Sequence, residues 1–287
     1  MRILKPQKNT YSEKARNGRA KVVAIAAQKG GVGKTTTAVH LAWDLATRLH
    51  RRVLLIDLDA QGHVRTHLSK FTRVETTKHI GEILLERRGN ITDVVVPTGV
   101  KNLHYTCADK NLHQVEIQLN AKIGKEMVLQ RALNTAREQY DIIVLDCPPN
   151  LGNLTVSALV AADSVLVPTD SSKLSLEGVS DILQTLEILD DTFGRCPQLE
   201  GILLTRVDRR SKRYNEEIRE AIRDLAGDEL FGAEIPAQSM VAKAQSQGTT
   251  VFDLDLRSAA AQAYMQLTDE VSESLGLRTT GTNRLRA

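Results

Sequence analysis

The chain has 287 residues, of which 41% are hydrophobic and 25% are charged, a composition close to that of an ordinary soluble globular protein. A net charge of only +3 and an aromatic content of 3% argue against a uniformly basic nucleic-acid binder and against aromatic stacking platforms for single strands. Three scattered cysteines, the lack of a secretory signal and the lack of a long apolar run argue against a disulfide scaffold and a membrane span, so we expect a cytoplasmic protein.

The two ends of the chain differ in composition from the middle. Residues 1–20 carry six Lys or Arg side chains against a single acid, Glu13, and the last residues are polar. Such a charge run is typical of a solvated tail rather than a folded core. We therefore predict a flexible basic tail at 1–20, a single folded domain at 21–276 and a flexible tail at 277–287.

Between the tails, short apolar runs alternate with segments of helical periodicity. This alternation predicts an α/β fold with a mainly parallel β-sheet and helices on both faces. The predicted strands are residues 22–26, 53–56, 103–106, 142–145, 164–167 and 201–204. The predicted helices are residues 34–49, 79–87, 126–139, 174–189, 215–226 and 259–275.

A glycine-rich segment follows the first predicted strand and opens the first predicted helix, the context of a phosphate-binding loop. Glycines let backbone N–H groups approach phosphate, and the helix N-terminus adds partial positive charge. Lys34 is expected to reach the β- and γ-phosphates, and the Thr35 hydroxyl to bind Mg²⁺. The ordinary pattern has glycine where this chain has Gln28, and Lys29 is an additional lysine. The predicted nucleotide-binding residues are Lys29, Gly30, Gly31, Val32, Gly33, Lys34, Thr35 and Thr36.

Carboxylates follow two more of the predicted strands. Asp57 and Asp59 come after the strand at 53–56, and alternation places both side chains on the same side, toward Mg²⁺ or a water molecule. Asp146 follows the strand at 142–145, the position of a Walker B aspartate. We therefore predict a metal site that includes Thr35, Asp57 and Asp146.

Together these segments resemble the ParA/MinD family of deviant Walker A ATPases, most closely its ParA-type, Soj-like partition branch. The segment KGGVGKTTT resembles the family's two-lysine phosphate loop, DLDAQG its DxDxQG segment and DCPP its DxPP segment. The likeness extends over about residues 21–275 and implies a doubly wound P-loop fold. It also implies ATP and Mg²⁺ as ligands, slow ATP hydrolysis and a homodimer that forms around ATP.

The resemblance also assigns roles to single residues. Lys29 corresponds to the lysine that reaches across the dimer to the partner's phosphates, where it and Lys34 stabilise charge on the transferring phosphoryl group. Asp59 corresponds to the aspartate that positions the attacking water. In relatives, base contacts come from two segments that fall here at 205–208 and 235–238. The candidate nucleotide contacts in these segments are Arg206, Asp208 and Pro236.

A basic cluster follows the last predicted strand, with Asp208 as the single acid among five Lys or Arg residues between positions 206 and 213. Such a cluster can neutralise several backbone phosphates of double-stranded DNA without reading sequence. The resemblance favours DNA, because relatives use basic residues here and near the C-terminus. The family's IPRNVRLSEA-like segment differs in this chain, which has Ala237 and Met240 in place of two arginines and adds Lys243. The candidate DNA contacts are Arg209, Arg210, Lys212, Arg213, Lys243 and Arg257.

We interpret the chain as a ParA-type ATPase for plasmid or chromosome partition. The ATP dimer would bind nucleoid DNA without sequence preference, and a ParB-like centromere-binding partner would stimulate hydrolysis and release it. One alternative is a family ATPase that positions a protein cargo on the nucleoid. The acidic last helix and the polar tail disfavour a MinD-like membrane-associated division regulator. The short N-terminal segment disfavours an operator-binding repressor.

Overall fold

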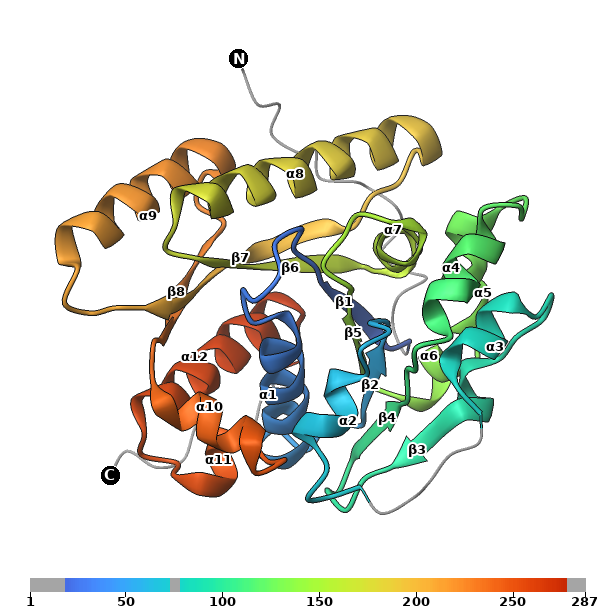
Figure 1. The fold of residues 1–287 in the computed structure, drawn as a ribbon, viewed down its shortest axis with the longest axis horizontal. Coiled ribbons are helices and arrows are strands. Elements are labelled where there is room, and N and C mark those ends of the chain that lie inside the picture. Colours follow the sequence, from blue (N-terminus) through green and yellow to red (C-terminus); the bar gives the residue numbers. More distant parts are fainter. Residues whose placement is uncertain (1–18, 73–77, 278–287) are drawn as a thin grey trace.

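The computed structural model describes residues 19–72 and 78–277, so the predicted tails lie almost entirely outside the described residues. A single eight-stranded sheet crosses the described part of the chain in the order β3-β4-β2-β5-β1-β6-β7-β8 (Figure 1). All neighbouring strands are parallel except β3, which pairs antiparallel with β4 at one edge. The strands are β1 Lys21–Ile25, β2 Val53–Asp57, β3 Val95–Pro97, β4 Leu103–Thr106, β5 Ile142–Asp146, β6 Ser164–Asp170, β7 Gln198–Val207 and β8 Leu230–Pro236.

Helices cover both faces of this sheet, which confirms the predicted α/β class (Figure 1). One face carries α1 Lys34–Thr47, α2 His63–His67, α10 Ser239–Ser246, α11 Val251–Leu254 and α12 Ala259–Ser274. The other carries α3 Ile80–Leu85, α4 Leu112–Leu119, α5 Val128–Ala132, α6 Ala136–Gln139, α7 Asn153–Ala161, α8 Lys173–Phe193 and α9 Lys212–Ala226. Two 3₁₀ helices, η2 Ile91–Val94 and η3 Lys125–Met127, lie in the connections.

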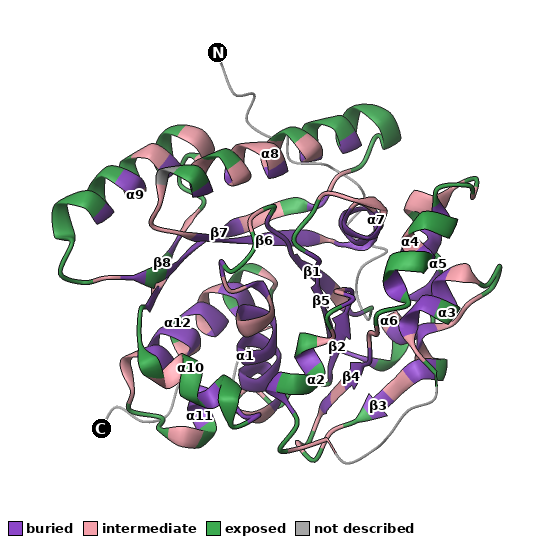
Figure 2. Cartoon of the chain, in the orientation of Figure 1, coloured by how far each residue is buried: buried purple, intermediate pink, exposed green. Residues whose placement is uncertain are grey.

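Strand β1 shows how the sequence builds two apolar cores. Successive side chains of a strand point to opposite faces of the sheet. Val22 and Ala24 accordingly pack with the α7 and α8 layer, while Val23 and Ile25 pack with the α1 and α12 layer. All four side chains are fully buried, and Figure 2 shows the central strands buried along their length. A strand that is covered on both faces therefore needs apolar residues at successive positions.

The six predicted strands are present with ends shifted by no more than three residues, because short apolar runs bounded by polar residues define their centres well. The predicted helix at 126–139 is wrong as a single element. It is divided into η3, α5 and α6, because the chain tightens where the Asn134 N–H bonds to the Arg131 carbonyl, 3.3 Å away. The edge strands β3 and β8 and the helices α2, α4, α7, α10 and α11 were not predicted.

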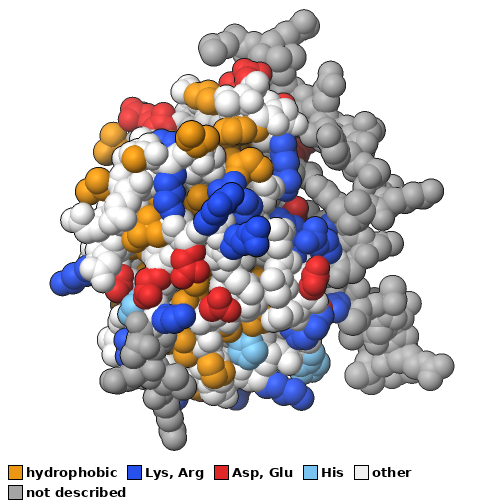
Figure 3. Space-filling view, turned by 90° about the vertical axis from the view of Figure 1, so that its right-hand side faces the viewer, with side chains coloured by type: hydrophobic (Ala, Val, Ile, Leu, Met, Phe, Trp, Pro, Cys, Tyr) orange, Lys and Arg blue, Asp and Glu red, His pale blue; other side chains and the backbone are white. Residues whose placement is uncertain are grey.

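The side of the molecule formed by α3, α4 and α5 mixes basic, acidic and hydrophobic side chains rather than gathering one kind (Figure 3). Ile117 of α4 and Ile123 beyond it are among the exposed hydrophobic residues. Single exposed hydrophobic residues are normal on protein surfaces. Within residues 19–72 and 78–277, no helix is both long and apolar enough to cross a membrane.

A part-buried ion pair fixes the amino-terminal end of the sheet opposite the phosphate loop. One oxygen of Asp163 accepts hydrogen bonds from the Val22 N–H at 2.9 Å and from Arg137 at 3.0 Å. Arg137 also donates to the Ala161 carbonyl at 2.6 Å, so the pair joins β1, α6 and the start of β6. Both side chains are 12% exposed.

Asp163→Ala should therefore destabilise the fold by about 2–4 kcal/mol, because it leaves the Arg137 charge without its carboxylate and the Val22 N–H without its acceptor. Urea denaturation measures this loss. Asp191→Ala, at the exposed end of α8, is the matched control and should change stability by less than about 0.5 kcal/mol. Equal stability of the two variants would contradict the role given to Asp163.

Candidate nucleotide site

The phosphate loop leaves β1 after Ile25 and enters α1 at Lys34, as predicted. Gly31 and Gly33 have φ of 76° and 88°, a left-handed conformation that favours glycine. Gly33 is the N-cap of α1 and offers no side chain, so the first N–H groups of the helix remain available to a ligand. A Cβ on Gly30 or Gly31 would meet no atom within 4 Å, which leaves open space over the loop for phosphate groups.

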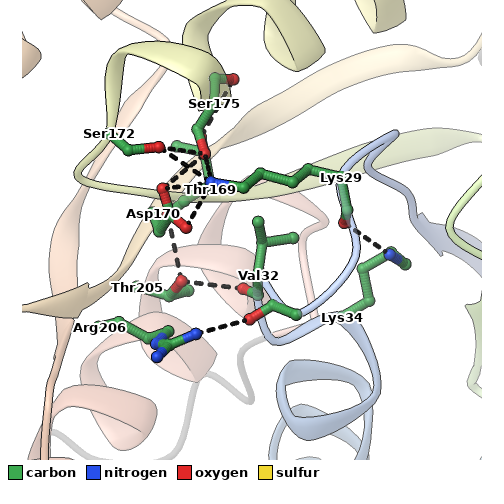
Figure 4. Close-up of polar contacts among 10 residues, drawn as sticks. Lys29, Val32, Lys34, Thr169, Asp170, Ser172, Ser175, Thr205 and Arg206 are labelled. Atoms are coloured by element: carbon green, nitrogen blue, oxygen red, sulfur yellow. Dashed lines mark hydrogen bonds and ion pairs between the residues drawn. The ribbon is translucent and has the colours of Figure 1, made fainter.

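Lys34 is a buried lysine within this loop. Its ammonium donates a 3.1 Å hydrogen bond to the Lys29 carbonyl (Figure 4). Burial lowers the pKa of Lys34, and the charges of Asp146 and Asp59 oppose that change. The three side chains that the sequence placed in one site are therefore close enough to interact electrostatically.

Asp57 and Asp146 are the last residues of neighbouring parallel strands, paired directly across β2 and β5. Both are almost completely buried. The oxygens of Asp57 accept hydrogen bonds from the N–H groups of Asp59 at 3.0 Å and Val64 at 3.2 Å. Asp57 thus organises the loop between β2 and α2. Neither oxygen of Asp146 has a hydrogen-bond partner in the described part of the chain.

The two buried carboxylates are unfavourable in the ionised form without a cation. Burial raises the pKa of Asp146, and the nearby Thr35 hydroxyl and Lys34 ammonium only partly offset it. Burial and the charge of Asp146 likewise raise the pKa of Asp57. A buried, unpartnered carboxylate beside a threonine hydroxyl is the donor set that Mg²⁺ prefers, so these residues fit the predicted metal. Thr35 and Asp146 are the better placed ligands, since Asp57 already accepts two backbone hydrogen bonds.

Asp59 lies in the loop after β2 and is partly exposed. Its carboxylate accepts the Gln61 N–H at 3.0 Å, and Gly62, with φ of 63°, then turns the chain into α2. Asp59 is thus less buried than Asp57 and Asp146, and its charge interacts with those of Lys34 and Asp146. The position is compatible with the predicted contact to an attacking water.

The Lys29 side chain extends toward the end of β6 and the start of α8 (Figure 4). It forms an ion pair with Asp170 at 2.9 Å and is also bonded to Ser172 and Ser175. The sequence reasoning missed these three residues. Asp170 has the same signal as Asp57 and Asp146, a carboxylate at the end of a buried strand, and β6 lies directly beside β1.

The segments predicted to contact the base, 205–208 and 235–238, include the carboxyl ends of the adjacent strands β7 and β8. Arg206, with φ of 54°, donates to the Gly31 carbonyl of the phosphate loop at 3.4 Å. Asp208 instead pairs with Arg210 at 2.8 Å, away from the loop. Pro236 lies beside the end of β7 in the register of the sheet. Of the three candidates, only Arg206 is hydrogen-bonded to the phosphate loop.

Comparison with known proteins agrees with this geometry. The sequence pattern of a family described as an AAA domain matches residues 20–199. The sporulation initiation inhibitor protein Soj of Bacillus subtilis is 36% identical over 252 residues, which cover 88% of this chain and 98% of Soj. The chain belongs to the ParA/MinD family of P-loop ATPases.

Other family members and a solved structure give the same result. The chromosome partitioning protein ParA of Caulobacter vibrioides is 37% identical over 253 residues, or 88% of this chain and 93% of that protein. The crystal structure of cobyrinic acid a,c-diamide synthase from Mycobacterium smegmatis with bound ADP and magnesium has a TM-score of 0.73 and is 29% identical. That match covers 90% of this chain and 97% of the synthase.

Asp146→Asn should stabilise the nucleotide-free protein at pH 7.5 by about 1–2 kcal/mol, because it removes a buried charge whose burial the Lys34 ammonium only partly offsets. Folding raises the pKa of this carboxyl. The folded state therefore loses stability as pH rises from the pKa of the unfolded chain to the higher pKa of the folded state. The advantage of the variant should therefore shrink as pH falls toward 5. The variant should also lose the extra stabilisation that Mg²⁺ adds to ATP binding.

Thermal unfolding with and without Mg²⁺ and a non-hydrolysable ATP analogue measures both effects. A variant that is less stable than the wild type without nucleotide, or that keeps the full response to Mg²⁺, would contradict the role of Asp146.

Proposed function

We propose that this protein is a ParA-type ATPase of DNA partition, switched by ATP between a monomer and a DNA-binding homodimer. The observation that carries the proposal is the second lysine of the phosphate loop, Lys29, which is present in addition to the Gly-Lys-Thr segment of an ordinary phosphate loop. The similarity to Soj and to the Caulobacter ParA over nearly the whole chain supports the partition role. Nucleotide and magnesium bound by the 29%-identical synthase support ATP and Mg²⁺ as ligands.

Each part of the site has a proposed task in hydrolysis. Magnesium, held by Thr35 and Asp146, would neutralise phosphate charge. Lys34 exchanges the Lys29 carbonyl for the β- and γ-phosphates, since its ammonium already lies within the loop. Asp59, partly exposed in the loop after β2, orients the attacking water. Catalysis is then mostly electrostatic, with Lys29 of the second protomer adding positive charge to the transferring group.

The candidate DNA contacts come from three segments that are joined by hydrogen bonds. The loop after β7 and the segment after β8 are linked by the Ala237 N–H and the Val207 carbonyl at 3.0 Å. The Gln238 side chain accepts the Ala260 N–H at 3.2 Å, which brings the start of α12 to the same region. The six basic candidates here are all exposed: Arg209, Arg210, Lys212, Arg213, Lys243 and Arg257.

These segments begin at the sheet edge that carries the phosphate loop, and Arg206 contacts that loop directly. We infer that the nucleotide state and dimer formation position them for double-stranded DNA. Arg210 and Arg213 are paired with Asp208 and Glu217, so each exchanges an exposed acidic partner for phosphate. Exposed ion pairs are weak, and the exchange costs little.

The proposal includes a ParB-like partner that stimulates hydrolysis, and a nucleoid location in the cytoplasm while ATP is bound. The Caulobacter relative supports this, being a chromosome partitioning protein. A MinD-like membrane role has less support: the apolar side of α12 is buried against α1 and β8, leaving no amphipathic face on that helix for a lipid surface.

Double-stranded DNA of arbitrary sequence should bind with ATP and Mg²⁺ but weakly with ADP or without nucleotide. Fluorescence anisotropy titrations at several salt concentrations measure this. Lys212→Ala should weaken binding about three- to tenfold and reduce the salt slope by roughly one. Lys101→Ala, an exposed lysine before β4 at the opposite sheet edge, is the control and should leave both unchanged. Equal binding in all three nucleotide states would refute the switch.

A further inference from the structure

The Lys29 ammonium is held within its own protomer by the end of β6 and the start of α8 (Figure 4). It lies 2.9 and 3.2 Å from the two carboxylate oxygens of Asp170, 2.9 Å from the Ser172 hydroxyl and 3.1 Å from the Ser175 hydroxyl. A lysine ammonium has three protons to donate and no acceptor. These contacts therefore occupy all of its hydrogen-bonding capacity.

The three residues around Lys29 are arranged for a cation. Ser175 is buried and donates a 2.6 Å hydrogen bond to Asp170. Ser172 occupies the N-cap position of α8, yet its hydroxyl makes no capping bond and contacts Lys29 instead. Although partial burial opposes ionisation, hydrogen bonds from Lys29, Ser172 and Ser175 lower the pKa of Asp170 to about 2. The carboxylate is thus ionised at neutral pH, and the site does not depend on pH in that range.

We propose that Asp170, Ser172 and Ser175 form a holding site that keeps Lys29 in its own protomer until ATP-dependent dimerisation transfers it to the partner's phosphates. This inference rests on the proposed function, in which Lys29 acts across a dimer. While the holding site occupies all three protons of the ammonium, Lys29 has none left for a phosphate oxygen. The three residues contact Lys29 and act through it, so they are positioning residues.

Two properties make the holding site suitable for a switch. The side chains of Lys29 and Asp170 are 34% and 19% exposed, so water reaches the ion pair and the lysine can exchange partners. A symmetric dimer also brings two copies of Lys29, and two holding sites must open for each dimer. The equilibrium constant for opening one site therefore enters the dimerisation constant twice.

The test is dimerisation of the full chain with Mg²⁺ and a saturating non-hydrolysable ATP analogue, followed by sedimentation velocity. Asp170→Asn removes the charge of the holding site and keeps its shape. If the substitution raises the equilibrium constant for releasing Lys29 about threefold in each protomer, the dissociation constant of the dimer should fall roughly tenfold. Ser172→Ala should shift dimerisation in the same direction by a smaller factor. Asp191→Asn, the same chemical change at the exposed end of α8, should have no effect.

If Asp170 affected dimerisation only through the fold, its substitution would have the same effect whether or not Lys29 is present. Since Lys29→Ala is itself expected to be largely monomeric, adding Asp170→Asn to it should not raise the fraction of dimer. A wild-type protein that dimerises with the analogue, together with an Asp170→Asn variant that dimerises no more tightly, would overturn the holding site and leave the proposed function intact. Failure of the wild type to dimerise would instead refute the proposed function. If Asp170→Asn does not fold, Ser172→Ala decides the question, because it retains the carboxylate.

Discussion

The burial of two carboxylates at adjacent strand ends is the constraint on which the nucleotide site depends. Asp57 and Asp146 are neighbours in the register of β2 and β5, where water cannot stabilise their charges. Backbone N–H groups compensate Asp57 and thereby fix the loop that carries Asp59. Asp146 accepts no hydrogen bond within the described chain, and the Lys34 ammonium only partly offsets its burial, so a bound cation would stabilise its charge further.

The two lysines of the phosphate loop are also compensated by nearby carboxylates. Two lysines in one short loop repel each other, and Lys29 is compensated by Asp170 while Lys34 interacts with Asp146 and Asp59. In the proposed function, a bound nucleotide adds several negative charges to this site. Both lysines would then be drawn toward phosphate, Lys34 within its own protomer and Lys29 across the dimer, and the residues that held them would determine when the exchange occurs.

The parts of the fold that the sequence predicts well are those defined by local patterns. The segment from β1 through the phosphate loop to α1 combines an apolar run, glycines with positive φ and a helical period, all within about thirty residues. The carboxyl-end rule for parallel sheets then places Asp57 and Asp146 together without knowledge of the strand order, and the structure shows them paired.

The parts that could not be predicted depend on contacts between distant segments. Asp170 contacts Lys29 only because β6 lies beside β1, a pairing across more than a hundred residues. Strand β8 contains Gly232 and Glu234, which weaken its apolar pattern, and its place at the sheet edge tolerates them. The break between α5 and α6 arises from one tightened turn that no residue in the sequence marks as a helix end.

The central claim is that ATP joins two copies of this chain through Lys29. Native mass spectrometry of the wild type and of Lys29→Ala, each with Mg²⁺ and ADP or a non-hydrolysable ATP analogue, tests it most directly. The account predicts a wild-type dimer that carries two analogue molecules, a monomer with ADP, and a Lys29→Ala variant that binds nucleotide but stays largely monomeric. The same oligomeric state with both nucleotides, or an analogue-bound dimer of Lys29→Ala as abundant as that of the wild type, would contradict it.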